Sequence, residues 1–132
     1  MSLNDSEVKV VVAIAVLQSL GKAPTVAKIS KVTNIDKGYV RNILLKLERM
    51  GLLRVYTSAG FGFMGSIPEG KVWVLREDLE EIVEKHPEII EWAKRIPEEE
   101  LRANSKEELI RKIKNIGNTK LGEEILRRLE ST

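Results

Sequence analysis

A continuous apolar run near the start of the chain predicts a buried helix. Residues 10–17 are all apolar, Asn4 or Asp5 precedes them as a candidate N-cap, and Gly21 follows them. Because a cap at one end and a glycine at the other suit a helix better than a strand, we predict a helix over residues 6–20. A helix that is apolar on every side is covered on more than one side. We expect its own domain to cover one side, and the C-terminal segment or a second copy of the chain to cover the other.

Two shorter helices follow, each with apolar positions three and four residues apart. The first is predicted over residues 26–32, with Thr25 as its N-cap. The second is predicted over residues 37–50, where Asp36 caps the start and Gly51 ends the helix. Four apolar side chains of this second helix are expected to face the core: Val40, Ile43, Leu44 and Leu47.

After residue 51 the hydrophobic pattern changes from a helical period to an alternating one. Leu52, Val55 and Tyr56 suit a short strand, and residues 71–75 suit a second. A glycine-rich stretch over residues 58–70 joins the two. The first part of the chain is therefore predicted to form helices followed by a β-hairpin.

The rest of the chain carries further amphipathic stripes and predicts two to four helices. Pro87 interrupts the first stripes, and Ser105 with Glu108 has the spacing of a capping box. We therefore predict a mainly α fold with a small β-hairpin. It would comprise one domain over residues 1–75 and a helical extension over residues 76–132.

The composition removes most enzyme classes. The chain has no Cys, which excludes disulfides, thiolate metal sites and cysteine nucleophiles. Its single histidine, His86, cannot supply a multi-histidine zinc site and stands at a predicted helix junction. The acidic runs 80–81 and 98–100 are interpreted as solvent-facing. We expect no catalytic residues, no metal and no cofactor.

Hydrophobicity also bears on where the chain works. The apolar run of residues 10–17 is much shorter than the roughly 20 residues that a membrane-spanning helix needs, and no basic leader precedes it. We expect a soluble, cytoplasmic protein without a membrane partner. A single Gln, no Cys and abundant Lys and Glu are a balance common in proteins of hot-living organisms.

The net charge of +2 hides an uneven distribution along the chain. Residues 1–75 hold ten Lys or Arg against five Asp or Glu, whereas residues 76–132 hold twelve against fifteen. The basic part is the candidate for contact with a polyanion such as nucleic acid. The simpler interpretation is that these charges only solvate helix faces.

Three spaced positions within residues 25–53 form a known pattern. Ser30 is small, Asn34 follows four residues later where a left-handed residue is needed, and Val40 is an apolar position ten residues after Ser30. This pattern resembles the helix-turn-helix of winged-helix transcription regulators of the MarR-like and ArsR-like kind, which are common in bacteria and archaea. The resemblance covers about residues 6–75 and implies a winged helix-turn-helix that binds double-stranded DNA.

In that family the helix equivalent to residues 37–50 lies in the major groove. Arg can bond guanine with two parallel hydrogen bonds, Asn can do the same with adenine, and Tyr can pack on a thymine methyl group or reach a phosphate. The resemblance implies that the base-reading residues are Lys37, Tyr39, Arg41 and Asn42. The expected phosphate-binding residues are Thr25, Lys28, Lys31, Lys46, Arg54 and Lys71. The alternative for Arg41 and Asn42 is a pair of solvated surface positions.

Two features depart from the family pattern. Leu45 stands where a polar residue is expected, and we expect it either to close against the C-terminal helices or a partner, or simply to be exposed. The hairpin loop has no basic residue before Lys71 and instead presents Phe61, Phe63 and Met64. Such a loop can fold back on the core, dock on a protein partner or second subunit, or wedge between base steps. Docking would make the chain an interaction module of a transcription or replication assembly.

The resemblance also implies a homodimer. In MarR-like proteins the terminal helices build a twofold dimer, so we expect residues 76–132 and the first helix to form the interface. A dimer places two recognition helices about one DNA turn apart and reads a palindromic site. The expected function is that of a dimeric, sequence-specific transcription regulator. The alternative is a separate helical domain that senses a ligand or binds another protein.

Overall fold

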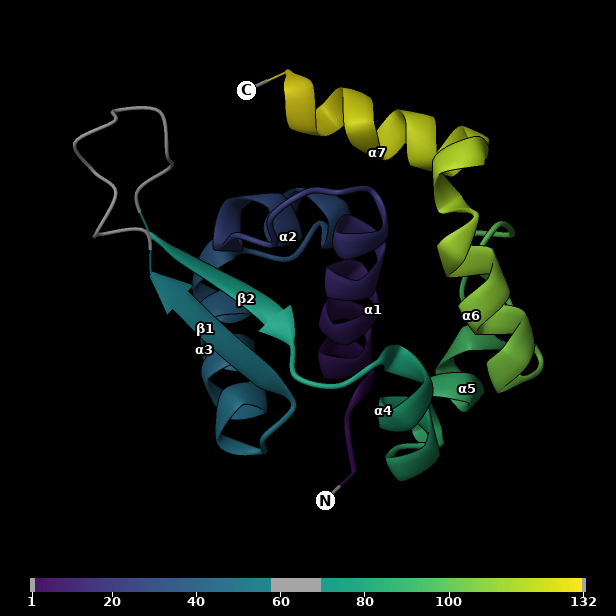
Figure 1. Cartoon of the computed structure of the whole chain (residues 1–132), viewed down its shortest axis with the longest axis horizontal. Helices are drawn as coiled ribbons and strands as arrows, with labels where there is room; N and C mark the ends of the chain where they lie inside the picture. Colours follow the sequence, from purple (N-terminus) through teal and green to yellow (C-terminus); the bar gives the residue numbers. More distant parts are fainter. Residues whose placement is uncertain (1, 58–69, 132) are drawn as a thin grey trace.

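The computed structural model describes residues 2–57 and 70–131, and it is mainly helical with one small antiparallel sheet (Figure 1). Its elements, in chain order, are α1 (Asp5–Ser19), α2 (Val26–Thr33), α3 (Lys37–Arg49), β1 (Leu53–Thr57), β2 (Lys71–Leu75), α4 (Leu79–Lys85), α5 (Glu88–Ala93), α6 (Lys106–Lys114), the 3-10 turn η2 (Ile116–Asn118) and α7 (Lys120–Glu130). The predicted mainly α fold with a β-hairpin is confirmed, and the helix and strand bounds differ from the predicted ones by one residue in most cases.

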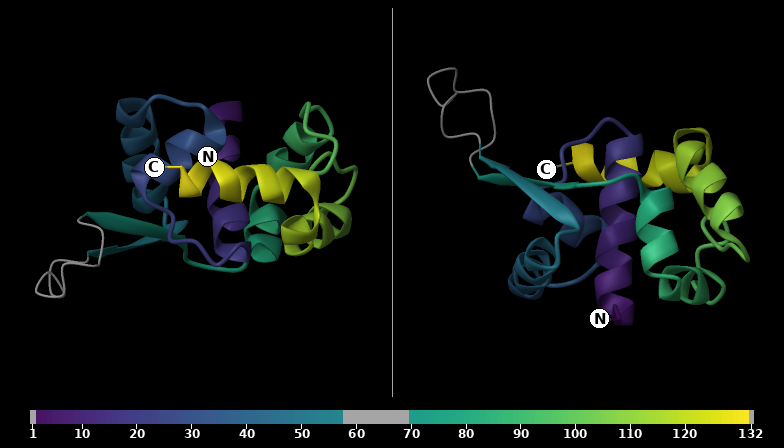
Figure 2. Two further views of the ribbon diagram at one scale, coloured as in Figure 1. Left: turned by 90° about the horizontal axis from the view of Figure 1, so that it is seen from above. Right: turned by 60° about the horizontal axis from the view of Figure 1, so that its bottom comes forward.

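Helix α1 runs through the middle of the molecule. It packs against α2, α3 and β2 on one side and against α5 and α6 on the other (Figures 1 and 2). Val8 and every residue from Val10 to Leu17 are buried within the single chain. The C-terminal segment thus covers the side that a second copy could have covered. Within the single chain, the apolar residues of α1 from Val10 to Leu17 are therefore all covered, and the expected homodimer stays a prediction.

The local signals at the helix ends work as the sequence predicts. The side chains of Asn4, Thr25 and Asp36 accept hydrogen bonds from backbone N–H groups of the first turns of α1, α2 and α3, at 2.9, 3.2 and 3.0 Å. These bonds satisfy donors that a helix leaves without an internal partner. Gly21 and Gly51 follow α1 and α3 with φ of +70° and +81°, a region that favours glycine.

The turn between α2 and α3 is held by side-chain hydrogen bonds. Asn34 ends α2 in the left-handed conformation, with φ 59° and ψ 30°. The Ser30 hydroxyl donates to the Ile35 carbonyl at 2.5 Å, so this residue bridges the turn as well as being small. Val40 is fully buried on the inner face of α3. The turn therefore fixes how α3 is held against α2.

The hairpin has one inward and one outward face. Val55 pairs with Trp73, and Trp73 is buried beneath the sheet. Arg54 and its partner Val74 point to the other face, because adjacent strand residues alternate. The backbone N–H of Trp73 also donates to the Pro24 carbonyl at 2.9 Å, which ties β2 to the segment before α2.

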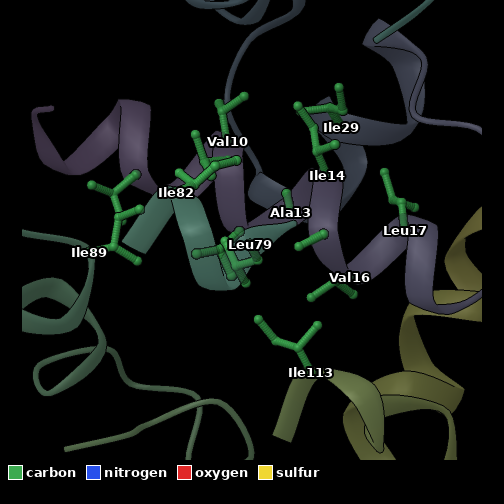
Figure 3. Close-up of a cluster of buried hydrophobic side chains, with 14 of the residues drawn as sticks. Val10, Ala13, Ile14, Val16, Leu17, Ile29, Leu79, Ile82, Ile89 and Ile113 are labelled. Carbon is green, nitrogen blue, oxygen red and sulfur yellow. The ribbon is translucent and has the colours of Figure 1, made fainter. Parts of the chain in front are cut away.

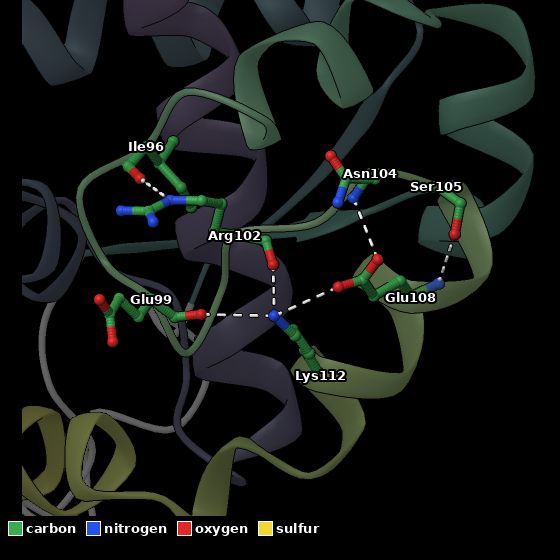
Figure 4. A network of polar contacts seen from close by, with 7 residues as sticks. All are labelled: Ile96, Glu99, Arg102, Asn104, Ser105, Glu108 and Lys112. Atoms are coloured by element: carbon green, nitrogen blue, oxygen red, sulfur yellow. Dashed lines mark hydrogen bonds and ion pairs between the residues drawn. The ribbon is translucent and has the colours of Figure 1, made fainter.

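The C-terminal helices wrap around α1, and a polar network holds the connection between α5 and α6 (Figure 4). The Lys112 ammonium donates to the backbone carbonyls of Glu99 and Arg102 and lies 3.4 Å from the Glu108 carboxylate. Ser105 caps α6, but the Glu108 carboxylate accepts from the Asn104 N–H and not from that of Ser105. The predicted capping box is thus formed with a shift of one residue.

One hydrophobic core joins both parts of the chain. Buried side chains from α1, α2, α4, α5 and α6 meet around α1, among them Ile14, Ile29, Ile82, Ile89 and Ile113 (Figure 3). Helix α7 folds back and packs against α2 (Figure 1). Among the described residues, no helix has both the length and the apolar composition required to cross a bilayer.

Candidate functional site

A groove runs between the start of α2, the outer side of α3 and β2. Its volume is about 530 Å³. It is lined by Thr25, Val26, Ala27, Lys37, Arg41, Leu45, Gly70, Lys71 and Trp73. Four of the residues that the sequence singled out, Thr25, Lys37, Arg41 and Lys71, therefore come together at one place.

Helix α3 presents the polar side that the sequence predicted. Lys37, Tyr39, Arg41 and Asn42 are all exposed, and Tyr39 keeps 51% of its surface. The 13 residues of α3 make a rod about 20 Å long. The diameter of a helix with its side chains, about 10–12 Å, matches the roughly 12 Å width of the major groove of DNA. Leu45 is 37% exposed and lines the groove, so it does not close against the C-terminal helices.

The cations of this groove are not neutralised by acidic neighbours. Lys37 and Arg41 form no ion pair with any residue of the described ranges. The Lys71 ammonium lies over the Trp73 ring, 5.9 Å from its centroid. A ring face attracts a cation but does not cancel its charge. The groove therefore carries positive charge that is available to an anion.

Several cations of the C-terminal part are paired with carboxylates. Lys85 lies 2.8 Å from Glu77, and its ammonium holds the pKa of that carboxyl below its usual range. Lys106 lies 2.6 Å from Glu84, and this hydrogen bond raises the pKa of the Lys106 ammonium. Both pairs are at the surface, where they add little stability. Other cations of the C-terminal part, among them Arg111, Lys114 and Lys120, form no ion pair within the described ranges, so unpaired positive charge is not confined to the groove.

Four of the predicted phosphate-binding residues do not join the groove. Lys46 is drawn to the other side of α3, where its ammonium lies 2.7 Å from the Glu7 carboxylate. The Lys31 ammonium donates to the Arg128 carbonyl of α7 at 3.4 Å. Neither of the remaining two lines the groove, since Arg54 points to the outer face of the hairpin and Lys28 lies elsewhere on α2. Helix periodicity predicted the exposed side of α3, but it could not predict the contacts of Lys46 with Glu7 and of Lys31 with Arg128.

Other predictions fall outside the part of the chain that the structure describes. The loop residues Phe61, Phe63 and Met64, which the sequence suggested as a partner surface, belong to residues 58–69 and lie outside the described ranges.

Trp73 is the groove residue that the sequence reasoning missed. The sequence pattern placed it only in a strand, yet Trp73 is one of the residues that line the groove. The Nε1–H group is buried and has no hydrogen-bond partner in the described structure. The signal was present in the alternation of β2, which places residues 71 and 73 on the same face of the hairpin.

The chain was also compared with known proteins. It matches no family model, no curated protein and no solved structure. Within residues 2–57 and 70–131, no group of three or more His, Asp or Glu side chains is placed to hold a metal ion. The residues of the groove and their geometry are therefore the evidence that bears on function.

The contact between Glu7 and Lys46 leads to a first prediction. Glu7 is buried, and its carboxylate also accepts from the Asn4 N–H at 3.0 Å, so it joins the start of α1 to the middle of α3. We expect Glu7→Gln and Lys46→Met each to lower the free energy of unfolding by about 1 kcal/mol, because the Lys46 side is partly in water.

Urea denaturation of the two single variants and the double variant tests this contact. The double variant is expected to lose about 1 kcal/mol less than the sum of the singles. Strictly additive losses would show that the ion pair does not hold α3 against α1.

Proposed function

We propose that this chain binds double-stranded DNA by placing α3 in the major groove. The observation that supports this most is the groove beside α3, where Lys37, Arg41 and Lys71 come together and form no ion pair with any acidic residue of the described ranges. The phosphates of DNA supply the opposite charge, and their neutralisation releases counterions. A helix with an exposed polar face and a cationic flank suits this polyanion better than it suits a neutral protein surface.

The local geometry also favours a winged helix-turn-helix. Asn34 is left-handed in the turn, Ser30 bridges it, and Val40 anchors α3 in the core, as the resemblance requires. A hairpin follows α3 directly. In such a fold α3 is the recognition helix, and its N-terminal half contacts base edges.

The exposed residues of α3 divide between two tasks. Arg41 lines the groove and is exposed, so it can reach a guanine edge with two hydrogen bonds. Asn42 follows it on the helix and can pair with adenine. Lys71 and Thr25 lie at the edge of the groove on other elements and suit phosphates. This division gives the protein sequence preference as well as affinity.

A role as a transcription regulator is the natural use of such binding, and we place it in the same proposal. Because α1 is covered within the chain, a second copy would pair through the C-terminal helices. Two copies about one DNA turn apart would read a palindromic site.

Variants of three cations test this proposal. We expect Arg41→Ala to weaken binding to a preferred duplex by about tenfold and to relax preference at one base position. Lys71→Ala should weaken binding to every duplex alike and reduce the salt dependence by about one phosphate contact. Arg111→Ala is the matched control, since Arg111 is exposed on α6, across α1 from α3 (Figure 1).

Fluorescence anisotropy with labelled duplexes measures all three variants. The control is expected to bind within about twofold of the unmodified chain. Equal losses in Arg41→Ala and Arg111→Ala would mean that only overall charge matters, and the assignment of α3 as the reading helix would be wrong.

A further inference from the structure

The indole N–H of Trp73, a residue of the groove, is buried and has no hydrogen-bond partner among the described residues. The residue as a whole is 2% exposed. Buried polar groups in proteins are nearly always paired, and an unpaired donor is costly. A donor kept in this state at the edge of a binding groove points to a partner that arrives with the ligand.

The chemistry of the surroundings defines that partner. An indole N–H can only donate, so the partner must be an acceptor. Lys71 lies over the same ring, and Lys37 and Arg41 line the same groove, so a negatively charged acceptor is favoured. The indole thus lies where an oxyanion would be held by positive charge from several elements.

The start of α2 adds further donors at the same place. Val26 and Ala27, the first residues of this eight-residue helix, line the groove beside Trp73. The N–H groups of a first helical turn have no partner within the helix, and the helix dipole favours an anion there. The Thr25 oxygen accepts from the Lys28 N–H at 3.2 Å, which leaves its own O–H free to donate.

We propose that the Trp73 indole N–H donates a hydrogen bond to a backbone phosphate of bound DNA, together with the first turn of α2 and the Lys71 ammonium. This inference rests on the proposed DNA binding and adds a specific phosphate-binding residue to it. In the free chain the Nε1 atom is shut off from solvent. The exposed Lys71 side chain lies over the ring. The proposal therefore requires that DNA binding opens the indole edge to the phosphate.

The two tryptophans of the chain provide a direct test. Trp73 lines the groove, whereas Trp92 lies on α5 on the other side of α1, so the ¹⁵N-labelled chain gives one indole N–H signal from the site and one from an internal control. Addition of a 20-base-pair duplex should move the Trp73 signal and leave the Trp92 signal in place. A duplex of the same sequence carrying neutral methylphosphonate linkages should bind more weakly and leave the Trp73 signal unmoved.

A variant provides the second arm. Trp73→Phe removes the donor and keeps an aromatic ring, and we expect it to lower duplex affinity by about tenfold. Trp92→Phe is the matched control and should bind like the unmodified chain. Anisotropy measures affinity, and circular dichroism confirms that both variants are folded.

The outcomes separate this inference from the proposed function. If the duplex binds but the Trp73 signal stays in place, the phosphate contact is wrong and DNA binding stands, even where Trp73→Phe is unstable. A Trp73 signal that moves with inorganic phosphate but not with the duplex would show a site for a free anion and would overturn the inference. Absence of any duplex binding in the anisotropy assay would overturn the proposed function itself.

Discussion

Replacement of Ile14 by alanine is expected to lower the free energy of unfolding by about 3–4 kcal/mol and the melting temperature by about 10–15 °C. Ile14 is fully buried in α1, on the side that faces α2 (Figure 3). A cavity there cannot collapse easily, because α1 is held from both sides by the rest of the chain. Ser19→Ala, at the exposed end of the same helix, is the control and should change stability by less than about 0.5 kcal/mol.

Thermal and urea denaturation measure this effect, and the tryptophans make it more informative. Trp73 reports on the hairpin and Trp92 on α5, so chains that keep only one of them follow each part separately. Because one core around α1 joins both parts, we expect coincident transitions. Two separate midpoints would show that residues 1–75 and 76–132 are independent domains.

Gly122→Ala is expected to destabilise the docking of α7 by about 3 kcal/mol. A Cβ at Gly122 would lie 1.8 Å from the Ile116 carbonyl oxygen, and this contact is with backbone that cannot rotate away. Helix α7 would have to move off η2 and with it off α2, against which it packs.

The nearby Gly117 is a matched control for this substitution. A Cβ there would have a side-chain atom of Leu20 as its nearest neighbour, at the ordinary contact distance of 3.7 Å. Gly117→Ala should therefore change stability by less than about 1 kcal/mol in the same denaturation experiment. Equal losses in the two variants would mean that the tight approach of α7 to η2 is not required.

The features that the sequence predicted correctly depend on interactions between residues close together in the chain. Asn4, Thr25 and Asp36 cap helices because their side chains reach N–H groups two or three residues away. Asn34 is left-handed for a similarly local reason. The helix bounds and the exposed side of α3 could therefore be derived without knowledge of the rest of the chain.

What the sequence could not predict depended on contacts between distant segments. The sequence of an apolar helix shows that the helix is covered, but it does not identify the segment that covers it. In the structure, the C-terminal helices α5 and α6 cover one side of α1. Lys46 has the spacing of an exposed position, yet Glu7 lies 39 positions earlier and pairs with it. The sequence predicts Trp73 only as a residue of a strand. Its place in the groove depends on how β2 packs beside α2.

The most direct test of the central claim is selection from a pool of random-sequence duplexes by the unmodified chain at two salt concentrations, about 50 and 200 mM. We expect one sequence motif to be enriched, and to occur as two inverted copies if two chains bind together. We also expect the affinity for this motif to fall by about a hundredfold between the lower and the higher salt concentration. Binding that is absent, or that enriches no sequence at either concentration, would contradict the assignment of α3 as a DNA-reading helix.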